Sequence, residues 1–424
     1  MKLALRSLAA WAFCAAALLA SAVAAAEQDL QDQVAARVQQ LGGKIAYDDQ
    51  QQIVAINLFE RQTTDADVEL ISQLLAVKEL VLWGAEISDA GVAHLKHLTS
   101  LEELVLENTS LTDQGVAALK DLPNLKSLNL RRSTYLTDAG LEHVAQIPQL
   151  QYLTLLYNNI GDAGLAHLQD KKQLRLLDIR GCMLVTDYGL EHLAGLENLK
   201  ALKMRNPAVS DDGVKHLTHL KSLVALAMED ANITDQGLQR ISEMPKLVEL
   251  NIFRCYSITD MGLAALANLP ELKSLTLRDI PIGDEGVAHL QALTKLSKLD
   301  LSETIAGDEG LAALEGMNEL RWLNLWHTEV GDEGLNLLAE LENLEYLNLM
   351  DTQVGDAGLA HLSGLTKLTE LNLQHTGVTD AGMRHLTGLK NLQKLNLTLT
   401  QVTAAGVEQL QAALPDLAIK HVGQ

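Results

Sequence analysis

A regularly spaced column of carboxylates is the first feature of this sequence that could support chemistry. Its members recur at a nearly constant interval: Asp65, Asp89, Asp113, Asp138, Asp162, Asp187, Asp211, Asp235, Asp260, Asp284, Asp308, Asp332, Asp356 and Asp380. Such a column could bind calcium, but no D-x-D-x-D-G loop accompanies it. Each aspartate precedes an apolar helical pattern, as in Thr379-Asp380, so we expect it to begin a helix and interact favourably with the helix dipole.

Histidines form a second column, three residues after a glycine that also recurs in each copy. They are His94, His143, His167, His192, His216, His289, His361 and His385. Four lie in consecutive copies, and stacked imidazoles could bind zinc or respond to pH. Neighbouring helices are ~8–10 Å apart, however, and each histidine adjoins an apolar stripe residue. We therefore predict a generic repeat position and no metal site.

Basic residues gather in the middle of the chain at positions that strand alternation should leave on the open face of a sheet. They are Arg131, Arg180, Lys203, Arg205 and Arg278, and Arg132 and Arg254 at the eighth repeat position extend the strip. Arginine suits bidentate contacts with carboxylates, so this strip could dock an acidic peptide or an anionic glycan. The alternative is that the arginines pair with acids of the same sheet. The candidate acids are Asp178, Glu229 and Glu249.

Aromatic residues form the strongest candidate binding site. Trp322, Trp326 and Tyr346 fall at exposed sheet positions in adjacent copies, with His327 beside them. Aromatic residues make up only 3% of the chain, and exposed tryptophans are enriched at binding hot spots. The alternative is that these rings stack on one another and cover a row of asparagines. That row is Asn324, Asn348 and Asn372.

The elements that position these side chains come from one repeated unit, seen clearly in residues 344–367. Its template is L-x-x-L-x-L-x-x-T-x-V-T/G-D-x-G-L-x-x-L-x-x-L-x-x, and fifteen copies follow one another. The alternation in Leu347-Asn348-Leu349 predicts a short strand, and the threefold steps that follow predict a helix. A glycine stands two residues after each aspartate except in the first copy, which has Asp67. One unit cannot bury its apolar side alone, so the copies must stack.

This unit resembles the leucine-rich-repeat family, whose pattern is L-x-x-L-x-L-x-x-N/C-x-L. Most copies are similar to the bacterial secreted type, with threonine at the ninth position, whereas the copies with Cys182 and Cys255 resemble the cysteine-containing class. The resemblance implies an α/β fold, a right-handed horseshoe solenoid with a parallel sheet on the concave face and short helices on the convex face. It implies a binding scaffold and no particular reaction.

Composition and segment boundaries agree with one elongated domain. We predict a signal peptide at 1–26, an N-terminal cap of helix and hairpin at 27–55, repeats at 56–403 and a C-terminal cap at 404–424. The net charge of −22 argues against nucleic acid as a general partner.

The segment from Met1 to Ala26 has the features of a secretory signal. Lys2 and Arg6 precede an uncharged apolar stretch, and Ala24-Ala25-Ala26 supplies an A-x-A cleavage site. A membrane anchor is the competing interpretation, but the apolar stretch is short for a bilayer span. We predict an exported protein (periplasmic, surface-bound or secreted) without stable membrane insertion after signal removal.

The two cysteines of the predicted mature chain should not form a disulfide. Cys182 and Cys255 occupy the same repeat position three copies apart. Neighbouring strands are ~4.8 Å apart, which places the two residues ~14 Å apart. A disulfide requires Cα atoms within ~7 Å, so we predict reduced, inward-facing thiols.

No catalytic motif accompanies the repeat. The sequence has no G-x-S-x-G elbow, H-E-x-x-H pair, phosphate loop or paired-cysteine metal spacing. We predict a non-catalytic protein without a cofactor that binds another macromolecule, preferably a protein, on its concave face. Two alternatives stay open: a substrate-recognition subunit of a ubiquitin-ligase-type complex, and a cell-wall glycan-binding protein that uses the tryptophans.

Overall fold

The structure is a computed structural model that describes residue 22 and residues 24–421. Most of the predicted signal peptide therefore lies outside the described residues. The chain divides into two compact units, one up to Leu174 and one from Arg175 onward. The predicted repeat region, 56–403, contributes to both units.

The first unit begins with a helix over residues 24–41 and an antiparallel hairpin of β1 (Lys44–Tyr47) and β2 (Ile53–Gln62). Parallel strands follow: β3 (Glu79–Trp83), β4 (Glu103–Glu107), β5 (Ser127–Asn129) and β6 (Tyr152–Thr154). Between them lie α2 (Asp65–Ile71), α3 (Asp89–Val92), η1 (Ala93–His97), α4 (Asp113–Val116), η2 (Ala117–Asp121) and α5 (Asp138–Ala145), and α6 (Asp162–Ala166) follows β6. A helix and a hairpin are thus present, but they span residues 24–62, whereas the predicted cap spanned 27–55.

The second unit repeats this strand and helix alternation to the end of the chain. Its parallel strands are β7 (Leu176–Asp178), β8 (Ala201–Arg205), β9 (Ala225–Glu229), β10 (Glu249–Asn251), β11 (Ser274–Thr276), β12 (Lys298–Asp300), β13 (Trp322–Asn324), β14 (Tyr346–Asn348), β15 (Glu370–Asn372), β16 (Lys394–Asn396) and β17 (Ala418–Lys420). Its helices are α7 (Asp187–Glu191), α8 (Asp211–Leu217), α9 (Asp235–Ile241), η3 (Asp260–Asn268), α10 (Asp284–Ala288), η4 (His289–Ala292), η5 (Glu309–Leu314), α11 (Asp332–Leu337), α12 (Asp356–His361), η6 (Leu362–Gly364), α13 (Asp380–Leu386) and α14 (Ala404–Ala413).

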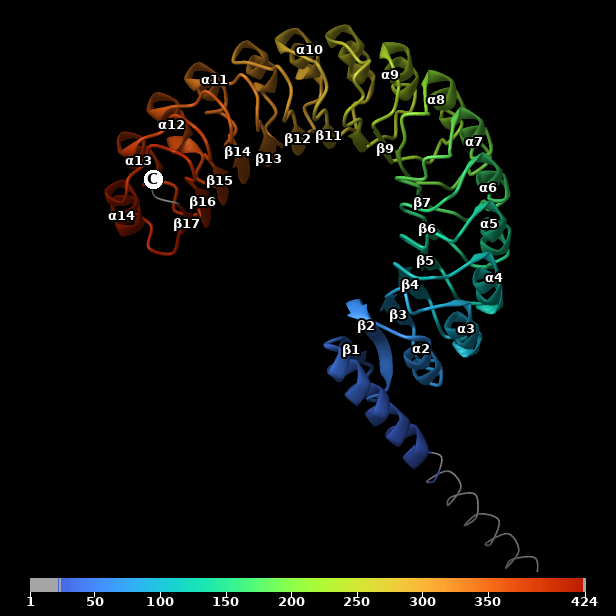
Figure 1. The fold of residues 1–424 in the computed structure, drawn as a ribbon. Helices are drawn as coiled ribbons and strands as arrows, with labels where there is room; N and C mark the ends of the chain where they lie inside the picture. The colour runs from blue at the N-terminus through green and yellow to red at the C-terminus, as the bar shows by residue number, and fades with distance from the viewer. Residues whose placement is uncertain (1–21, 23, 422–424) are drawn as a thin grey trace, which may run out of the picture. The chain divides into compact units, whose positions relative to one another are not determined.

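Within each unit the strands line one side and the helices line the opposite side (Figure 1). The strands pair in register, so that Trp322 lies opposite Tyr346 and Leu323 opposite Leu347. Residues at one repeat position therefore form a row across the sheet. The leucines between the two layers are fully buried, as Leu347 and Leu359 illustrate. This arrangement confirms the predicted α/β solenoid, with a parallel sheet on one side and short helices on the other.

The aspartate column begins the helices as predicted and also joins neighbouring copies. Asp356 is the first residue of α12, and its Oδ1 accepts a hydrogen bond of 2.8 Å from the backbone N–H of Thr379 in the next copy. Its Oδ2 accepts a second hydrogen bond, of 2.6 Å, from the Thr379 hydroxyl. A Cβ at Gly382 would lie 2.4 Å from Asp356 Oδ1. The Asp-x-Gly spacing thus lets each carboxylate reach the following copy.

The first copy departs from this rule because a cap helix, and no earlier repeat, precedes it. Asp67 takes the place of the glycine, and its Oδ1 accepts a hydrogen bond of 2.6 Å from Arg37 Nε in the helix 24–41. Asp67 is buried; although burial opposes ionisation, the hydrogen bonds from Arg37 and Thr64 keep the pKa of its carboxyl below the ordinary value. The side chain that replaces glycine therefore fastens the cap to the repeats.

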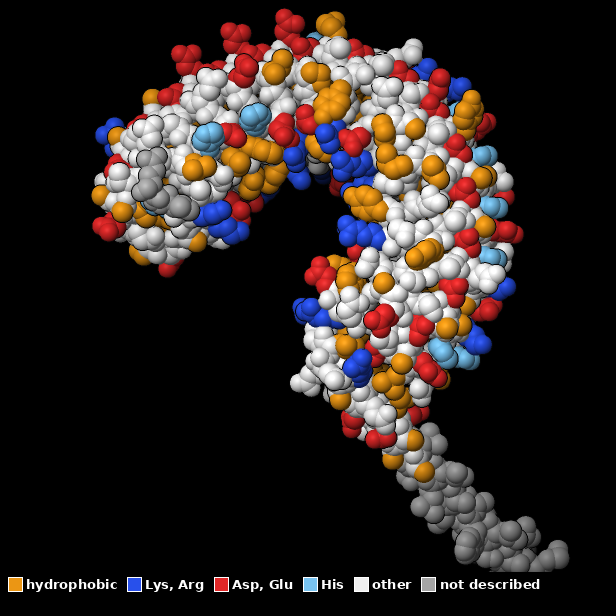
Figure 2. All heavy atoms as spheres, viewed as in Figure 1, with side chains coloured by type: hydrophobic (Ala, Val, Ile, Leu, Met, Phe, Trp, Pro, Cys, Tyr) orange, Lys and Arg blue, Asp and Glu red, His pale blue; other side chains and the backbone are white. Residues whose placement is uncertain are grey.

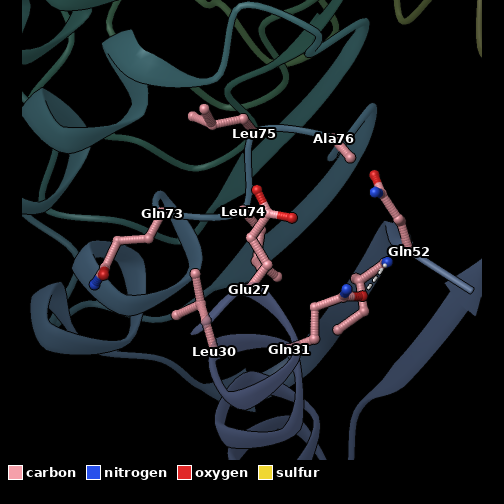
Figure 3. A pocket seen from close by; sticks show the side chains of 9 residues that line it. Glu27, Leu30, Gln31, Gln52, Gln73, Leu74, Leu75 and Ala76 are labelled. Atoms are coloured by element: carbon pink, nitrogen blue, oxygen red, sulfur yellow. Dashed lines mark hydrogen bonds between the residues drawn. The ribbon is translucent and has the colours of Figure 1, made fainter. Parts of the chain in front are cut away.

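A small hollow remains where this helix meets the first copy (Figure 3). It measures about 140 Å³ and is lined by Leu30, Leu74 and Leu75 among others. The amide oxygen of Gln31 accepts a hydrogen bond of 2.9 Å from the backbone N–H of Ile53, which ties the helix to β2. The helix thus covers apolar residues of the first copy, as a solenoid end requires.

Ninth-position residues satisfy backbone carbonyls at the strand ends. Thr352 Oγ1 donates a hydrogen bond of 2.6 Å to the carbonyl of Leu349, and Cys255 Sγ lies 3.0 Å from the carbonyl of Met228. Burial raises the pKa of the Cys255 thiol to about 12, so it stays protonated. Cys182 and Cys255 are both buried and form no disulfide, which confirms their predicted state.

Candidate functional site

A tight turn at the end of each strand determines which side chains project from the sheet. Asn324 Oδ1 accepts a hydrogen bond of 3.2 Å from the backbone N–H of Trp326, and Asn348 does the same for Met350 at 3.1 Å. His327, at the eighth position, then takes a left-handed backbone with φ of 53°. The asparagines are nearly buried and serve as turn formers. They offer little surface to a ligand.

The predicted aromatic residues lie on the sheet side, where two separate rows contain them. The first, which we call the third-position row, contains Lys298, Trp322 and Tyr346 from β12, β13 and β14. The Trp322 and Tyr346 rings stack with centroids 4.8 Å apart and planes inclined by 7°. Lys298 Nζ lies 4.5 Å from the centre of the Trp322 ring. Because β13 lies between β12 and β14, the lysine and the tyrosine take opposite faces of the indole.

The second row, which we call the seventh-position row, contains Phe253, Arg278 and Trp326. The Arg278 guanidinium lies 5.0 Å from the Phe253 ring centre and 4.9 Å from the Trp326 ring centre. Ser302, fully buried, occupies the same position in the copy between Arg278 and Trp326. This small residue lets the arginine reach the indole. Sequence reasoning did not select Phe253, although it stood at the same repeat position as Trp326.

The aromatic rings are half-buried, not freely exposed as predicted, because each row stacks on itself. The alternative interpretation therefore holds in part: Trp322 and Tyr346 do stack, and Asn324 and Asn348 beneath them are nearly buried. Burial also raises the pKa of the Tyr346 hydroxyl, and Glu370 and Asp300 raise it further. His327 is exposed and lies 3.7 Å from Asp351 through Nδ1 and Oδ2.

The predicted arginines at the seventh repeat position all have acidic partners, so this part of the basic strip is largely neutralised. Arg180 binds Asp178 at 2.8 Å and lies 3.6 Å from Glu229, as the alternative interpretation expected. Three further pairs were not foreseen, because they use acids outside the predicted set. They are Arg131–Glu107 at 3.5 Å in the first unit, and Arg205–Asp230 and Arg278–Glu303, both at 2.6 Å, in the second.

Eighth-position acids explain the last two of these pairs, whereas Glu107 lies on β4 at the seventh position. Asp230 and Glu303 have left-handed backbones, with φ of 55° and 58°, and their side chains reach the neighbouring arginines. The three predicted partners, in contrast, all lie on strand positions. Glu249, which was expected to pair, forms no ion pair within 4.0 Å in the described chain.

Lys203 and Arg132 are the exceptions within the basic strip, since no ion pair within 4.0 Å involves either residue in the described chain. Lys203 borders a hollow of about 190 Å³ in the second unit that also contacts Ala225, Ala227 and Glu249. The alanines leave room on the sheet face. Glu229 lines the same hollow, where burial raises the pKa of its carboxyl while Arg180 and Arg205 oppose the rise.

The two sides of the second unit differ in character. In Figure 2, basic and apolar side chains gather along its strand side, whereas acidic side chains project from its helical side. Within the described residues, no group of three or more His, Cys, Asp or Glu side chains is placed to hold a metal ion. In residues 22 and 24–421, no helix has the length and apolar character needed to cross a membrane.

Comparison with known proteins decides the family. A model described as "Leucine-rich repeat region" matches residues 158–408, which is more than half of the chain. A second model, "Leucine Rich repeat", matches residues 97–120. The chain belongs to the leucine-rich-repeat family. Leucine-rich repeats form protein-interaction scaffolds, so the predicted scaffold class is confirmed at this level.

Solved structures share the fold. This leucine-rich-repeat chain is similar to an internalin from Listeria monocytogenes, with a TM-score of 0.59, 23% identity, and coverage of 87% of this chain and 94% of that one. It is also similar to a leucine-rich-repeat protein from Leptospira interrogans, with a TM-score of 0.54, 20% identity, and coverage of 83% and 86%. No curated protein matches by sequence. These structures show the fold; the bacterial secreted type and the cysteine-containing class stay interpretations of the repeat sequence.

Proposed function

We propose that this protein is an exported, non-catalytic scaffold that binds a protein partner through the strand side of its second unit. The single observation that carries the proposal is the placement of Trp322, Tyr346, Trp326 and Arg278 on the sheet face in two ordered rows. Tryptophan, tyrosine and arginine are the residues most enriched at protein-binding hot spots. Because the rows already fix their rotamers, a partner would lose little side-chain entropy on binding.

The same rows favour protein over glycan at this surface. A sugar ring stacks on an open aromatic face, but Lys298 and Tyr346 cover both faces of Trp322. What remains accessible is a ridge of ring edges and charged groups. A protein surface can fit such a ridge by shape, and the hollow beside Lys203 could receive one of its side chains.

Export rests on the sequence from Met1 to Ala26, whose charged start, apolar stretch and A-x-A end suit a signal peptidase. Amino-terminal sequencing of the protein recovered outside the cytoplasm tests this directly. A mature chain that begins at Glu27 is expected. Recovery of the full-length chain in the membrane fraction would argue for an anchor.

A ubiquitin-ligase subunit is the weaker candidate. It would need an adaptor-binding module, whereas residues 24–62 form a cap helix and hairpin that cover the first copy. Both cysteines that suggested this class are buried, and Cys255 forms a hydrogen bond to the carbonyl of Met228.

The proposal is tested with the mature chain immobilised in an extract of the native cell envelope. Proteins retained by the wild type should be lost when Trp322→Ala and Trp326→Ala are combined. The matched control is Trp83→Ala, which removes a half-buried sheet-face tryptophan from β3 in the first unit. With the purified partner, the double variant should bind at least about tenfold more weakly, since hot-spot truncations cost ~2 kcal/mol or more. Equal retention by the double variant would overturn the proposal.

A further inference from the structure

A second hollow lies in the first unit, on the loops that follow β3, β4, β5 and β6. It measures about 520 Å³, within the ~300–1,000 Å³ of small-molecule sites. Its lining consists of Ala85, Asn108, Thr109, Ser110, Arg132, Thr134, Tyr135 and Tyr157. None of these residues belongs to the two aromatic rows, and only Arg132 belongs to the predicted basic strip.

The backbone holds three of these side chains in a row. Asn108, Arg132 and Tyr157 stand at the eighth position of consecutive copies, with φ of 58°, 56° and 58°. Hydrogen bonds between copies fix the loops: Asn108 N–H donates to Arg131 at 3.0 Å, and Arg132 N–H donates to Leu156 at 2.9 Å. The lining is therefore ordered before any ligand binds.

The tyrosines of this hollow differ from the tryptophans of the sheet face. Tyr135 is 63% exposed and Tyr157 is 43% exposed. The Arg132 guanidinium lies 5.6 Å from the Tyr157 ring centre. In the described chain, neither an aromatic ring nor a cation stacks on Tyr135. An open aromatic face of this kind is what the apolar face of a sugar ring needs.

The polar lining suits hydroxyl recognition. The side chains of Asn108 and Thr134 form no hydrogen bond within the described chain, and the Ser110 hydroxyl, which donates to the Ala85 carbonyl at 2.7 Å, can still accept. No carboxylate lines the hollow, although the whole chain carries a net charge of −22. Arg132 has no carboxylate within 4.0 Å in the described chain, so its guanidinium can bind one from a ligand.

We propose that this hollow binds a saccharide that carries a carboxylate. The sugar ring stacks on Tyr135, its hydroxyls bond to Asn108 and Thr134, and its carboxylate binds Arg132. An acidic peptide without aromatic residues would satisfy Arg132 but would offer no ring to stack on Tyr135. The proposal does not depend on the protein-binding function, because the two surfaces share no residue.

The test is calorimetric titration of the full mature chain with a defined panel. The panel holds oligomers of galacturonic, glucuronic and N-acetylneuraminic acid, the corresponding neutral galactose and glucose oligomers, and a glutamate hexapeptide. At least one acidic oligomer should bind, and more tightly than its neutral counterpart. Tyr135→Ala should weaken it about tenfold or more, in line with aromatic stacking energies. Arg132→Asn, which tolerates the left-handed backbone, should weaken acidic oligomers and spare neutral ones.

Two variants act as controls. Tyr188→Ala removes a tyrosine that is 77% exposed on α7, outside the hollow, and should bind as the wild type does. The Trp322→Ala and Trp326→Ala double variant should also keep its saccharide affinity, which separates this proposal from the first. Binding of no acidic oligomer, equal loss with Tyr188→Ala, or hexapeptide binding that Tyr135→Ala abolishes would each overturn the proposal. Equal affinity for acidic and neutral oligomers would overturn the role of Arg132.

Discussion

The third-position row of the second unit and the tyrosine hollow of the first unit use aromatic residues in opposite ways. In the row, Trp322 has Lys298 on one face and Tyr346 on the other. In the hollow, Tyr135 presents its ring to solvent. Both lie on the same repeated backbone, so the difference comes from position within the repeat.

Strand spacing explains the contrast. Paired strands are ~4.8 Å apart, which is close to the distance between stacked rings, so aromatic residues on adjacent strands cover one another. Tyr135 lies instead in the loop of one of the longer copies, where an extra residue projects away from the row. Tyr256 occupies the same kind of loop in another such copy, but there Arg254 lies 5.9 Å from its ring centre and Asp279 accepts a hydrogen bond from its hydroxyl. Of these aromatic side chains, Trp322 is covered by its row, whereas Tyr135 stays open in its loop.

Both units use the same aspartate contact between copies, and replacing one repeat glycine by alanine in each unit should give the largest effect. Gly140→Ala would put Cβ 2.5 Å from Asp113 Oδ1, and Gly382→Ala would put it 2.4 Å from Asp356 Oδ1. Each variant should lose about 1–3 kcal/mol of unfolding free energy, measured by urea denaturation. Gly364→Ala, where no atom lies within 4 Å, is the control. A loss in only one region would show that the two do not share the aspartate contact.

Loss of the ion pair between Arg37 and Asp67 in the cap of the first unit should lower stability by a smaller amount, which depends on pH. Because folding lowers the pKa of the Asp67 carboxyl, its contribution is present above the unfolded pKa of ~3.9 and is lost as the pH falls through the folded pKa. Arg37→Gln should cost about 1–2 kcal/mol at pH 7, as expected for a hydrogen bond to a charged group. The difference from the wild type should vanish in acid. A difference that persists at pH 2 would contradict this assignment.

Stacking in the third-position row can be measured with a double-mutant cycle. Trp322→Ala, Tyr346→Ala and their combination should give a coupling of about 0.5–1.5 kcal/mol in thermal or urea unfolding. Tyr346→Ala should also raise acrylamide quenching of tryptophan fluorescence, because it opens one face of the indole. Zero coupling together with unchanged quenching would mean that Tyr346 does not cover the Trp322 ring.

The salt dependence of ligand affinity should give the smallest difference between the two regions. On the strand side of the second unit Arg180, Arg205 and Arg278 are already paired, so partner binding should change less than about twofold between 0.05 and 0.3 M salt. Saccharide binding at Arg132 should weaken several-fold over the same range, because exposed charges are screened. Isothermal titration at both salt concentrations measures the two responses. The reverse order would indicate that the sheet arginines, and not Arg132, contact a charged ligand.

Much of the fold could be predicted from the repeat, because the strands, helices and caps follow from the spacing of residues within one copy. Thr379 as a helix cap, the buried Cys255 and the helix and hairpin before the first copy were all predicted. The arginine partners were harder to predict, because Asp230 and Glu303 reach the sheet only through a left-handed residue that the repeat pattern does not mark. Alternating charges at Asp230, Arg254 and Asp279 were the available signal. Tyr135 was missed because only strand positions were searched.

The sequence by itself determined the stacking unit, its register and the identity of the side chains on each row, because these follow from the period of the repeat. Only the tertiary structure decided which groups satisfy one another. The contacts between Asp356 and Thr379, between Trp322 and Tyr346, and between Arg278 and Glu303 each join different copies. Such contacts depend on strand spacing and side-chain rotamers, which exist only once the copies are stacked.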